Sequence, residues 1–243
     1  GGNATVTNND GTIASQVRSN GNFSVVTFTN GNGLVGHGLS SPPKLILTKT
    51  LDQDYTWSCY HGSLGKDKYI ALNTANPAYS VPGMWGSSEP TDSVFGITAS
   101  VAPDGASMVA YAWAETPGAS SFGEYSGNNT SKTVDCGFEP AFVMIKKTSA
   151  AADWIVFDNK IGDDTYLKPS TSDAEATNGS FTLLPNGFSL DNGGGDWNAV
   201  GQNYIYAAFA DTSSNTELTF EEPNEDLQYF QPGDQIGTQS GFA

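Results

Sequence analysis

The chain matches itself along most of its length, and this internal repeat constrains its fold more than any other feature. Trp57 falls on Trp154 at an offset of 97 residues, and the matching blocks keep their order at offsets between 93 and 99. A fixed period of this length indicates that one structural unit occurs twice in tandem. The longer blocks are residues 28–73 with 125–170, 93–97 with 186–190, and 108–116 with 204–212.

Turn sequences separate short apolar runs within each unit. Residues 30–33 read Asn-Gly-Asn-Gly and residues 103–105 read Pro-Asp-Gly, which supply the backbone conformations of tight turns. The runs between such turns are rich in β-branched and aromatic residues, and no helical crossover pattern separates them. We therefore predict an all-β fold of two tandem antiparallel β-sandwich modules, jelly-roll-like and related by internal duplication, over residues 22–116 and 119–212.

Residues 45–48 and 142–145 are apolar on both faces of a predicted strand. Because successive side chains of a strand point to opposite faces, both segments should be central strands covered on both sides. Trp57, Trp113 and Trp154 also fall within predicted strands, so we expect their indoles in the core.

Two flanking segments contain fewer strands than an independent fold requires. Residues 1–21 are polar and rich in Asn and Ser, and we interpret them as an N-terminal arm or linker. Residues 217–243 look like the first strands of a further module, and we interpret them as a partial C-terminal β module or arm. Leu218, Phe220 and Phe230 in this second flank would gain stability from burial on a neighbouring subunit, so we expect a homo-oligomer.

The charge balance excludes some classes of partner. Ten basic residues oppose 26 acidic residues, a formal net charge of −16, and such a surface repels nucleic acid and anionic membranes. Arg18 is the only arginine, so bidentate clamps on phosphate are not available. No apolar run approaches the roughly 20 residues that span a bilayer. The sequence opens with Gly-Gly-Asn rather than Met, so we expect a processed chain or a piece of a longer one.

We predict no enzymatic activity. The only histidines are His37, whose place Cys136 takes in the second unit, and His61, and no GxSxG or HExxH pattern occurs. Acidic pairs are what a glycosidase uses, but these fall in turn-like segments, where Asp also caps backbone groups. The acidic clusters are Asp52 with Asp54, Asp158 with Asp163 and Asp164, Asp191 with Asp196, and Glu221 with Glu222, Glu225 and Asp226.

Two loops contain candidate ligand-binding residues. Trp85 and Trp197 lie beside glycines, where an exposed indole can stack on a sugar, so both are candidate glycan-binding residues. The alternative is that each indole folds back and caps an open end of its sandwich. Residues 191–196 read Asp-Asn-Gly-Gly-Gly-Asp, and Asp191 and Asp196 are candidate calcium ligands because a flexible, oxygen-rich loop suits a hard cation. We expect no other cofactor.

The two cysteines, Cys59 and Cys136, are too few for a disulfide framework. A disulfide needs Cα atoms within about 7 Å, and these residues fall in different units. We therefore predict that they are not bonded to each other.

Four motifs within the two units are distinctive as sequence. They are residues 35–39 (Val-Gly-His-Gly-Leu), 43–47 (Pro-Lys-Leu-Ile-Leu), 136–146 (Cys-Gly-Phe-Glu-Pro-Ala-Phe-Val-Met-Ile-Lys) and 204–210 (Tyr-Ile-Tyr-Ala-Ala-Phe-Ala). They resemble modules in tail-fibre and other virion-surface proteins of bacteriophages, especially phages of marine and cyanobacterial hosts. The likeness covers residues 12–212. The motifs are structural, so they indicate what the chain belongs to rather than what it binds.

This resemblance implies a virion-surface or extracellular, tail-fibre-like structural protein that contributes to host attachment. It implies other virion proteins and a host cell-surface glycan as partners, and a trimer as the homo-oligomer. Weak single contacts would then be multiplied, since avidity adds factors of roughly 10² to 10⁴. Three alternatives stay open: a purely structural phage component such as a fibre shaft, decoration or collar; a secreted bacterial adhesin or filament subunit; and a polysaccharide depolymerase.

Overall fold

The computed structural model describes residues 3–162, 164–177, 181–191 and 194–211. These residues contain nineteen β-strands and no helix. These residues lie in one compact unit, Gly1–Thr212. The paired strands run antiparallel, as at the centres of the two largest sheets. The predicted all-β class is confirmed. Among the described residues there is no helix of the length and apolarity that a membrane span requires.

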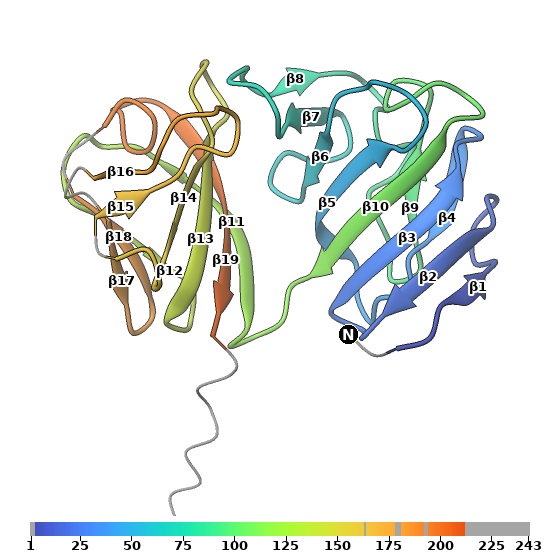
Figure 1. The fold of residues 1–243 in the computed structure, drawn as a ribbon, viewed down its shortest axis with the longest axis horizontal. Helices are drawn as coiled ribbons and strands as arrows, with labels where there is room; N and C mark the ends of the chain where they lie inside the picture. Colours follow the sequence, from blue (N-terminus) through green and yellow to red (C-terminus); the bar gives the residue numbers. More distant parts are fainter. Residues whose placement is uncertain (1–2, 163, 178–180, 192–193, 212–243) are drawn as a thin grey trace, which may run out of the picture. The chain divides into compact units, whose positions relative to one another are not determined.

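The first half of the chain, from β1 to β10, forms an eight-stranded sheet and a two-stranded sheet (Figure 1). β10 is central in the larger sheet, between β3 and β5. The order in the larger sheet is β1 (Val6–Asn8), β2 (Ser15–Ser19), β3 (Phe23–Thr29), β10 (Ser107–Ala114), β5 (Pro43–Thr50), β6 (Ser58–His61), β7 (Lys68–Ala71) and β8 (Tyr79–Ser80). The smaller sheet pairs β4 (Gly33–Gly36) with β9 (Val94–Ile97).

The second half forms sheets of four, three and two strands (Figure 1). β19 is central in the four-stranded sheet, between β11 and β13. This sheet has the order β11 (Ser120–Ser126), β19 (Asn203–Ala210), β13 (Pro140–Lys147) and β14 (Ile155–Asp158). The others are β12 (Lys132–Asp135), β18 (Gly187–Leu190) and β17 (Phe181–Leu184), and the pair β15 (Thr165–Tyr166) and β16 (Ala176–Thr177).

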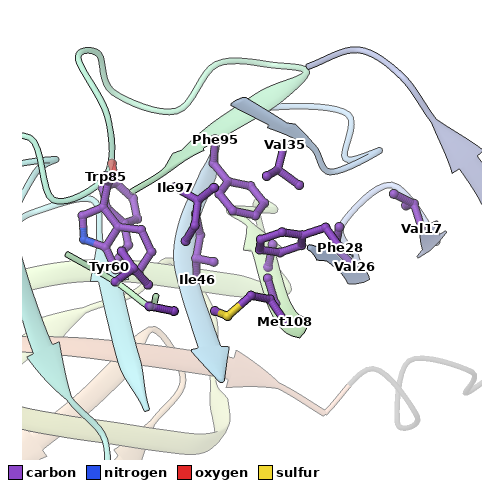
Figure 2. Close-up of a cluster of buried hydrophobic side chains, with 14 of the residues drawn as sticks. Val17, Val26, Phe28, Val35, Ile46, Tyr60, Trp85, Phe95, Ile97 and Met108 are labelled. Carbon is purple, nitrogen blue, oxygen red and sulfur yellow. The ribbon is translucent and has the colours of Figure 1, made fainter. Parts of the chain in front are cut away.

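Each half has its own apolar cluster, which lies between its larger and smaller sheets. In the first half Ile46 of β5 and Phe95 of β9 are fully buried and belong to one cluster (Figure 2). In the second half Val143 of β13 and Phe188 of β18 belong to another. These positions follow from strand alternation, since every second side chain faces the smaller sheet.

A third apolar cluster contains residues of both halves. Leu45 and Cys59 of the first half share it with Met144, Val156 and Ile205 of the second, and all five are buried. Thus the opposite faces of β5 and β13 are covered as well, which confirms the prediction that these strands are central and covered on both sides. The halves do not have two wholly separate cores, because each supplies the cover for the other's second sheet face.

Backbone and side-chain hydrogen bonds accompany this third cluster. The indole Nε1 of Trp154 donates to the carbonyl of Ala71 at 2.8 Å, and His61 Nε2 lies 3.0 Å from the carbonyl oxygen of Tyr206. Backbone amides also donate across the junction, from Ala78 to the carbonyl of Thr148 at 3.0 Å and from Ala152 to that of Ala75 at 2.8 Å. The contact between the halves therefore has fixed polar partners as well as apolar packing.

Lys146 is fully buried at the same junction, a position that the apolar run around it did not reveal. Its ammonium donates to the carbonyls of Ala152 and, at 3.5 Å, of Thr74, and lies 6.0 Å from the Trp154 ring centroid. Desolvation disfavours the charged form and lowers the pKa of Lys146 to about 8, although Asp153 opposes this shift.

The N-terminal flank differs from the expected arm or linker. Within residues 1–21, β1 and β2 extend the large sheet, with Val17 of β2 opposite Val26 of β3. Val17 is buried in the first cluster because alternation points it inward, a pattern that the abundant polar residues around it obscured. The interpretation of residues 217–243 as a partial module or arm lies outside the described residues.

We expect Ile205→Ala to lower the free energy of unfolding by about 2–5 kcal/mol, because it leaves a cavity where Ile205 is only 2% exposed. Since the third cluster joins the halves, native-state hydrogen exchange should speed up in both. Val200→Ala, at a side chain that is 70% exposed, is the control and should change stability by less than about 0.5 kcal/mol. Faster exchange confined to residues 119–212 would contradict the shared cluster.

Candidate ligand-binding site

Both histidines are buried and bonded to backbone groups. His37 Nδ1 accepts the Leu39 amide at 3.0 Å, and its Nε2 lies 3.1 Å from the Thr91 carbonyl oxygen. His61 Nδ1 accepts the Ser63 amide at 3.2 Å, and its Nε2 faces the Tyr206 carbonyl described above. In each ring one nitrogen accepts and the other donates, which is the neutral imidazole. Burial lowers the pKa of both, that of His61 to about 4.

Two of the acidic clusters cap backbone groups. Asp52 accepts the amide of Ser107 at 3.0 Å, and Asp158 accepts those of Lys160 at 2.7 Å and Ile161 at 3.0 Å. The Ser107 amide lowers the pKa of Asp52 because it stabilises the carboxylate. Asp158 thus binds its own loop and fixes a turn, whereas Asp52 ties its loop to the start of β10. Asp163 and the cluster at residues 221–226 lie outside the described residues.

Trp85 is not an exposed glycan-stacking residue, and that prediction is wrong. Its side chain is 0% exposed, its ring contacts Tyr60 edge-on at 5.8 Å, and its Nε1 donates to the Lys68 carbonyl at 2.9 Å (Figure 2). The loop folds back so that the indole closes one end of the first cluster, which is the alternative stated above. Gly96 permits this, because a Cβ there would lie 2.1 Å from the Trp85 carbonyl oxygen.

Trp197 likewise lies in a core. It is 7% exposed and packs on Phe181 at 5.1 Å and on Tyr166 at 5.7 Å, so it is not an exposed stacking platform either. Its carbonyl accepts the hydroxyl of Tyr125. The size of an indole explains both results, since burying it removes more apolar surface from water than any other side chain offers.

The described part of the chain does not bring the expected calcium ligands into a group of three acids. Asp196 lies 3.7 Å from the ammonium of Lys168, which also pairs with Asp153 at 3.2 Å. Asp191 is half-buried at the end of β18, and residues 192–193 of the expected loop lie outside the described residues. Among the residues that the structure describes, no three His, Cys, Asp or Glu side chains form a metal-binding group.

Aromatic residues that are only partly buried lie on β10 and beside β6. On β10, Ala110 and Ala112 face the first cluster, so Tyr111 and Trp113 point to the opposite face of the sheet. Trp57, just before β6, stacks on Tyr111 with ring centroids 6.3 Å apart. Trp113 is half-buried and packs against the third cluster, with its ring centroid 6.3 Å from that of Phe209, so its expected place in the core is confirmed in part. Trp57 is only half-buried, so the prediction of a core indole is wrong there.

A surface recess adjoins this aromatic pair. Its volume is about 320 Å³, and it is lined by Asp54, Tyr55, Thr56 and Asn73. Tyr55 is 40% exposed. Trp57 follows the recess directly in the chain, and its backbone amide donates to Asn73 Oδ1 at 3.3 Å. We call these four residues, with Trp57 and Tyr111, the aromatic recess.

Bonds to β5 and β10 hold the loop that carries the recess. The Leu51 amide donates to the Ser107 carbonyl at 2.7 Å, the Thr50 hydroxyl to the Gln53 carbonyl at 2.7 Å, and the Lys49 ammonium to the Tyr55 carbonyl. A loop fixed in this way loses little conformational freedom when a ligand binds. The sequence predicted that the Trp57 side chain is in the core, and no pattern indicated that it stays partly exposed.

Two further recesses differ in character. One, of about 560 Å³, lies over β4 and β9 and is lined mainly by small residues, among them Thr12, Gly33, Gly86, Ser87 and Ser88. The other, of about 340 Å³, is lined by Asn3, Arg18, Ser19, Asn20, Phe23 and Val25. Neither is lined by a carboxylate.

The fold and its surface define a layered all-β protein with open recesses on its sheets. A family model described as "Domain of unknown function (DUF7483)" matches residues 1–213, and the chain belongs to this family. No curated protein and no solved structure matches the chain.

We expect stability to fall as the pH is lowered from 6.5 to 4. The pKa of His61 is about 4 in the folded chain and 6.5 in the unfolded chain. Between these pH values the unfolded chain therefore binds a proton that the folded chain does not. The loss from this residue is about 3 kcal/mol and is complete below pH 4. Denaturant titrations of His61→Gln should show a correspondingly smaller decrease, and an equal decrease in both proteins would contradict this.

Both thiols are free, as predicted. Cys59 is buried, and burial raises its pKa as well as that of half-buried Cys136, the latter to about 11. At pH 8 only about one in a thousand Cys136 thiols is then ionised, so we expect very slow alkylation by iodoacetamide in the native protein and none at Cys59. Mass spectrometry should show two adducts after denaturation without reductant. A chain that takes up none would contradict the free thiols.

Proposed function

We propose that the chain is a tail-fibre-like structural protein of a virion surface, built from two copies of one β-sandwich module, that contributes to host attachment. The observation that carries this proposal is the placement of the phage-like motifs. Residues 43–47 lie in β5, 136–146 lead into and run along β13, and 204–210 run along β19. These are central strands of both halves, so the resemblance concerns the architecture itself.

The order of strands supports duplication of the module. β3, β10, β5 and β6 are neighbours in the first half, and β11, β19, β13 and β14 follow the same order in the second. The smaller sheets correspond too, since Val35 opposite Phe95 matches Val134 opposite Phe188. A common order of this kind follows naturally from one folded unit that occurs twice.

Local irregularities recur at matching places as well. The pairing of β10 with β5 skips Lys44, and the pairing of β19 with β13 skips Ala141, 97 residues later. Positive φ angles occur at Asn32 and again at Asn129. Further pairs with positive φ are Gly21 and Gly118, Gly38 and Gly137, Gly65 and Gly162, and Gly105 and Gly201. Such positions favour glycine or asparagine, so their recurrence supports a shared ancestor of the two halves.

The matching tryptophans differ in their surroundings. The Trp57 amide donates to Asn73 and the Trp154 amide to Ser170, each 16 residues ahead, so the backbones correspond. However, Trp154 is buried against the first half, while Trp57 is only half-buried. This difference opposes a strict equivalence of the two side chains and follows from Trp154 lying at the junction between the halves.

The proposed attachment role uses many weak contacts rather than one tight site. A homo-oligomeric fibre, with a trimer as the proposed form, multiplies such contacts by avidity. The formal net charge of −16 favours solubility and opposes binding to anionic surfaces, so attachment would use uncharged groups of the host surface.

Gold-labelled antibodies raised against the chain should decorate fibres on intact phage particles in electron micrographs. Antibodies absorbed with the purified chain serve as the control and should give no label. If the antigen is found only as free filaments or on bacterial cells, the secreted adhesin becomes the better description. Label on the particle body without an effect of the antibody on adsorption to cells would favour a purely structural component.

A further inference from the structure

We infer that the aromatic recess binds an uncharged saccharide. This inference names a ligand class for the proposed attachment role and in that sense rests on it, but the site can be tested on the isolated protein. The recess itself is lined by Asp54, Tyr55, Thr56 and Asn73, and the stacked pair of Trp57 and Tyr111 adjoins it through Trp57, which follows Thr56 in the chain.

The stacked pair supplies the apolar half of the site. A pyranose ring presents C–H groups on one face, and these pack on the face of an aromatic ring. Trp57 and Tyr111 lie nearly parallel, with an interplanar angle of 22°, and neither is fully buried. At the matching place in the second half Trp154 is covered, and its Nε1 bonds the Ala71 carbonyl.

The recess beside the pair supplies the polar half. Sugar hydroxyls both donate and accept, so a site for them needs acceptors and donors together. Asp54 contributes a carboxylate and Thr56 a hydroxyl. Asn73 Oδ1 is bonded to the Trp57 amide at 3.3 Å, so the amide nitrogen of the same side chain supplies the donors. Asp54 and Thr56 precede Trp57 in the chain, and Asn73 is bonded to the Trp57 backbone amide.

Charge selects an uncharged ligand over an anionic one. Asp54 lines the recess, and the chain as a whole carries 26 acidic residues against ten basic ones. The nearby ammonium of Lys49 donates to the Tyr55 carbonyl, where it holds the loop. Phosphorylated or carboxylated sugars would therefore be repelled, whereas neutral hexoses and N-acetylhexosamines would not.

We expect weak binding, with a dissociation constant on the order of 1 mM, because a small open recess buries only part of a monosaccharide. Saturation-transfer NMR with glucose, galactose, mannose and N-acetylglucosamine should show transfer to at least one of them. Backbone amide shifts should change at residues 54–57, 73 and 111. Choline, which aromatic residues beside a carboxylate also attract, serves as a probe for a cation site instead.

Trp57→Ala and, separately, Tyr55→Ala should weaken binding roughly tenfold, a loss of one stacking surface each. Tyr55 is an exposed loop residue, so its variant remains informative if Trp57→Ala does not fold. Leu51→Ala is the matched control, since Leu51 lies in the same loop and is 61% exposed but does not line the recess. This control should bind as tightly as the original chain.

Several results would overturn the inference. These are no transfer to any of the four sugars, transfer that Trp57→Ala and Tyr55→Ala leave unchanged, or shift changes for choline alone. A Trp57→Ala chain that loses oligomeric mass in light scattering without any sugar response would assign this face to subunit contact instead. None of these outcomes bears on whether antibodies decorate particles, so the attachment site and the virion location fail independently.

Discussion

The structure depends on burying both faces of its central strands. β5 and β13 carry apolar side chains on each face, and a strand of this kind is stable only between two covering layers. Each half supplies one layer from its own small sheet. The second layer comes from the other half, so Leu45 of the first half and Met144 of the second share one cluster. Neither half could expose this face to water without losing the burial of these residues.

The same junction explains why its polar groups have perturbed pKa values. Lys146 and His61 lie there with almost no exposed surface, and their partners are backbone carbonyls rather than carboxylates. Carbonyls satisfy hydrogen bonds but do not fully replace water around a charge, so burial favours the neutral form of both residues. The junction therefore tolerates a cation at Lys146 at a cost, whereas it holds His61 neutral.

The sequence predicted the all-β class and several of the strands and turns, because these depend on local patterns. It also predicted the double cover of residues 45–48 and 142–145 from alternation alone. It placed Trp154 correctly in the core, but Trp85 and Trp197 are buried from loops and Trp57 is only half-buried beside a strand. Whether an indole in a loop folds inward, or one beside a strand is covered, depends on the second layer, which no local pattern specifies. The candidate recess was missed for the same reason, and β1 and β2 were hidden by polar composition.

The second half covers the large sheet incompletely, and the part left uncovered is a surface that a ligand can reach. Where the second half covers the large sheet, Cys59 and Ile70 are sealed, but Trp57 and Tyr111 on the same face stay partly open. Aromatic side chains at such an edge keep one face for packing and one for a ligand. The loop beside them is already fixed by bonds to Ser107 and Asn73, so a ligand would meet a preformed surface. In the proposed attachment role, the architecture that stabilises the chain also determines where the ligand binds, and the formal net charge of −16 disfavours anionic ligands.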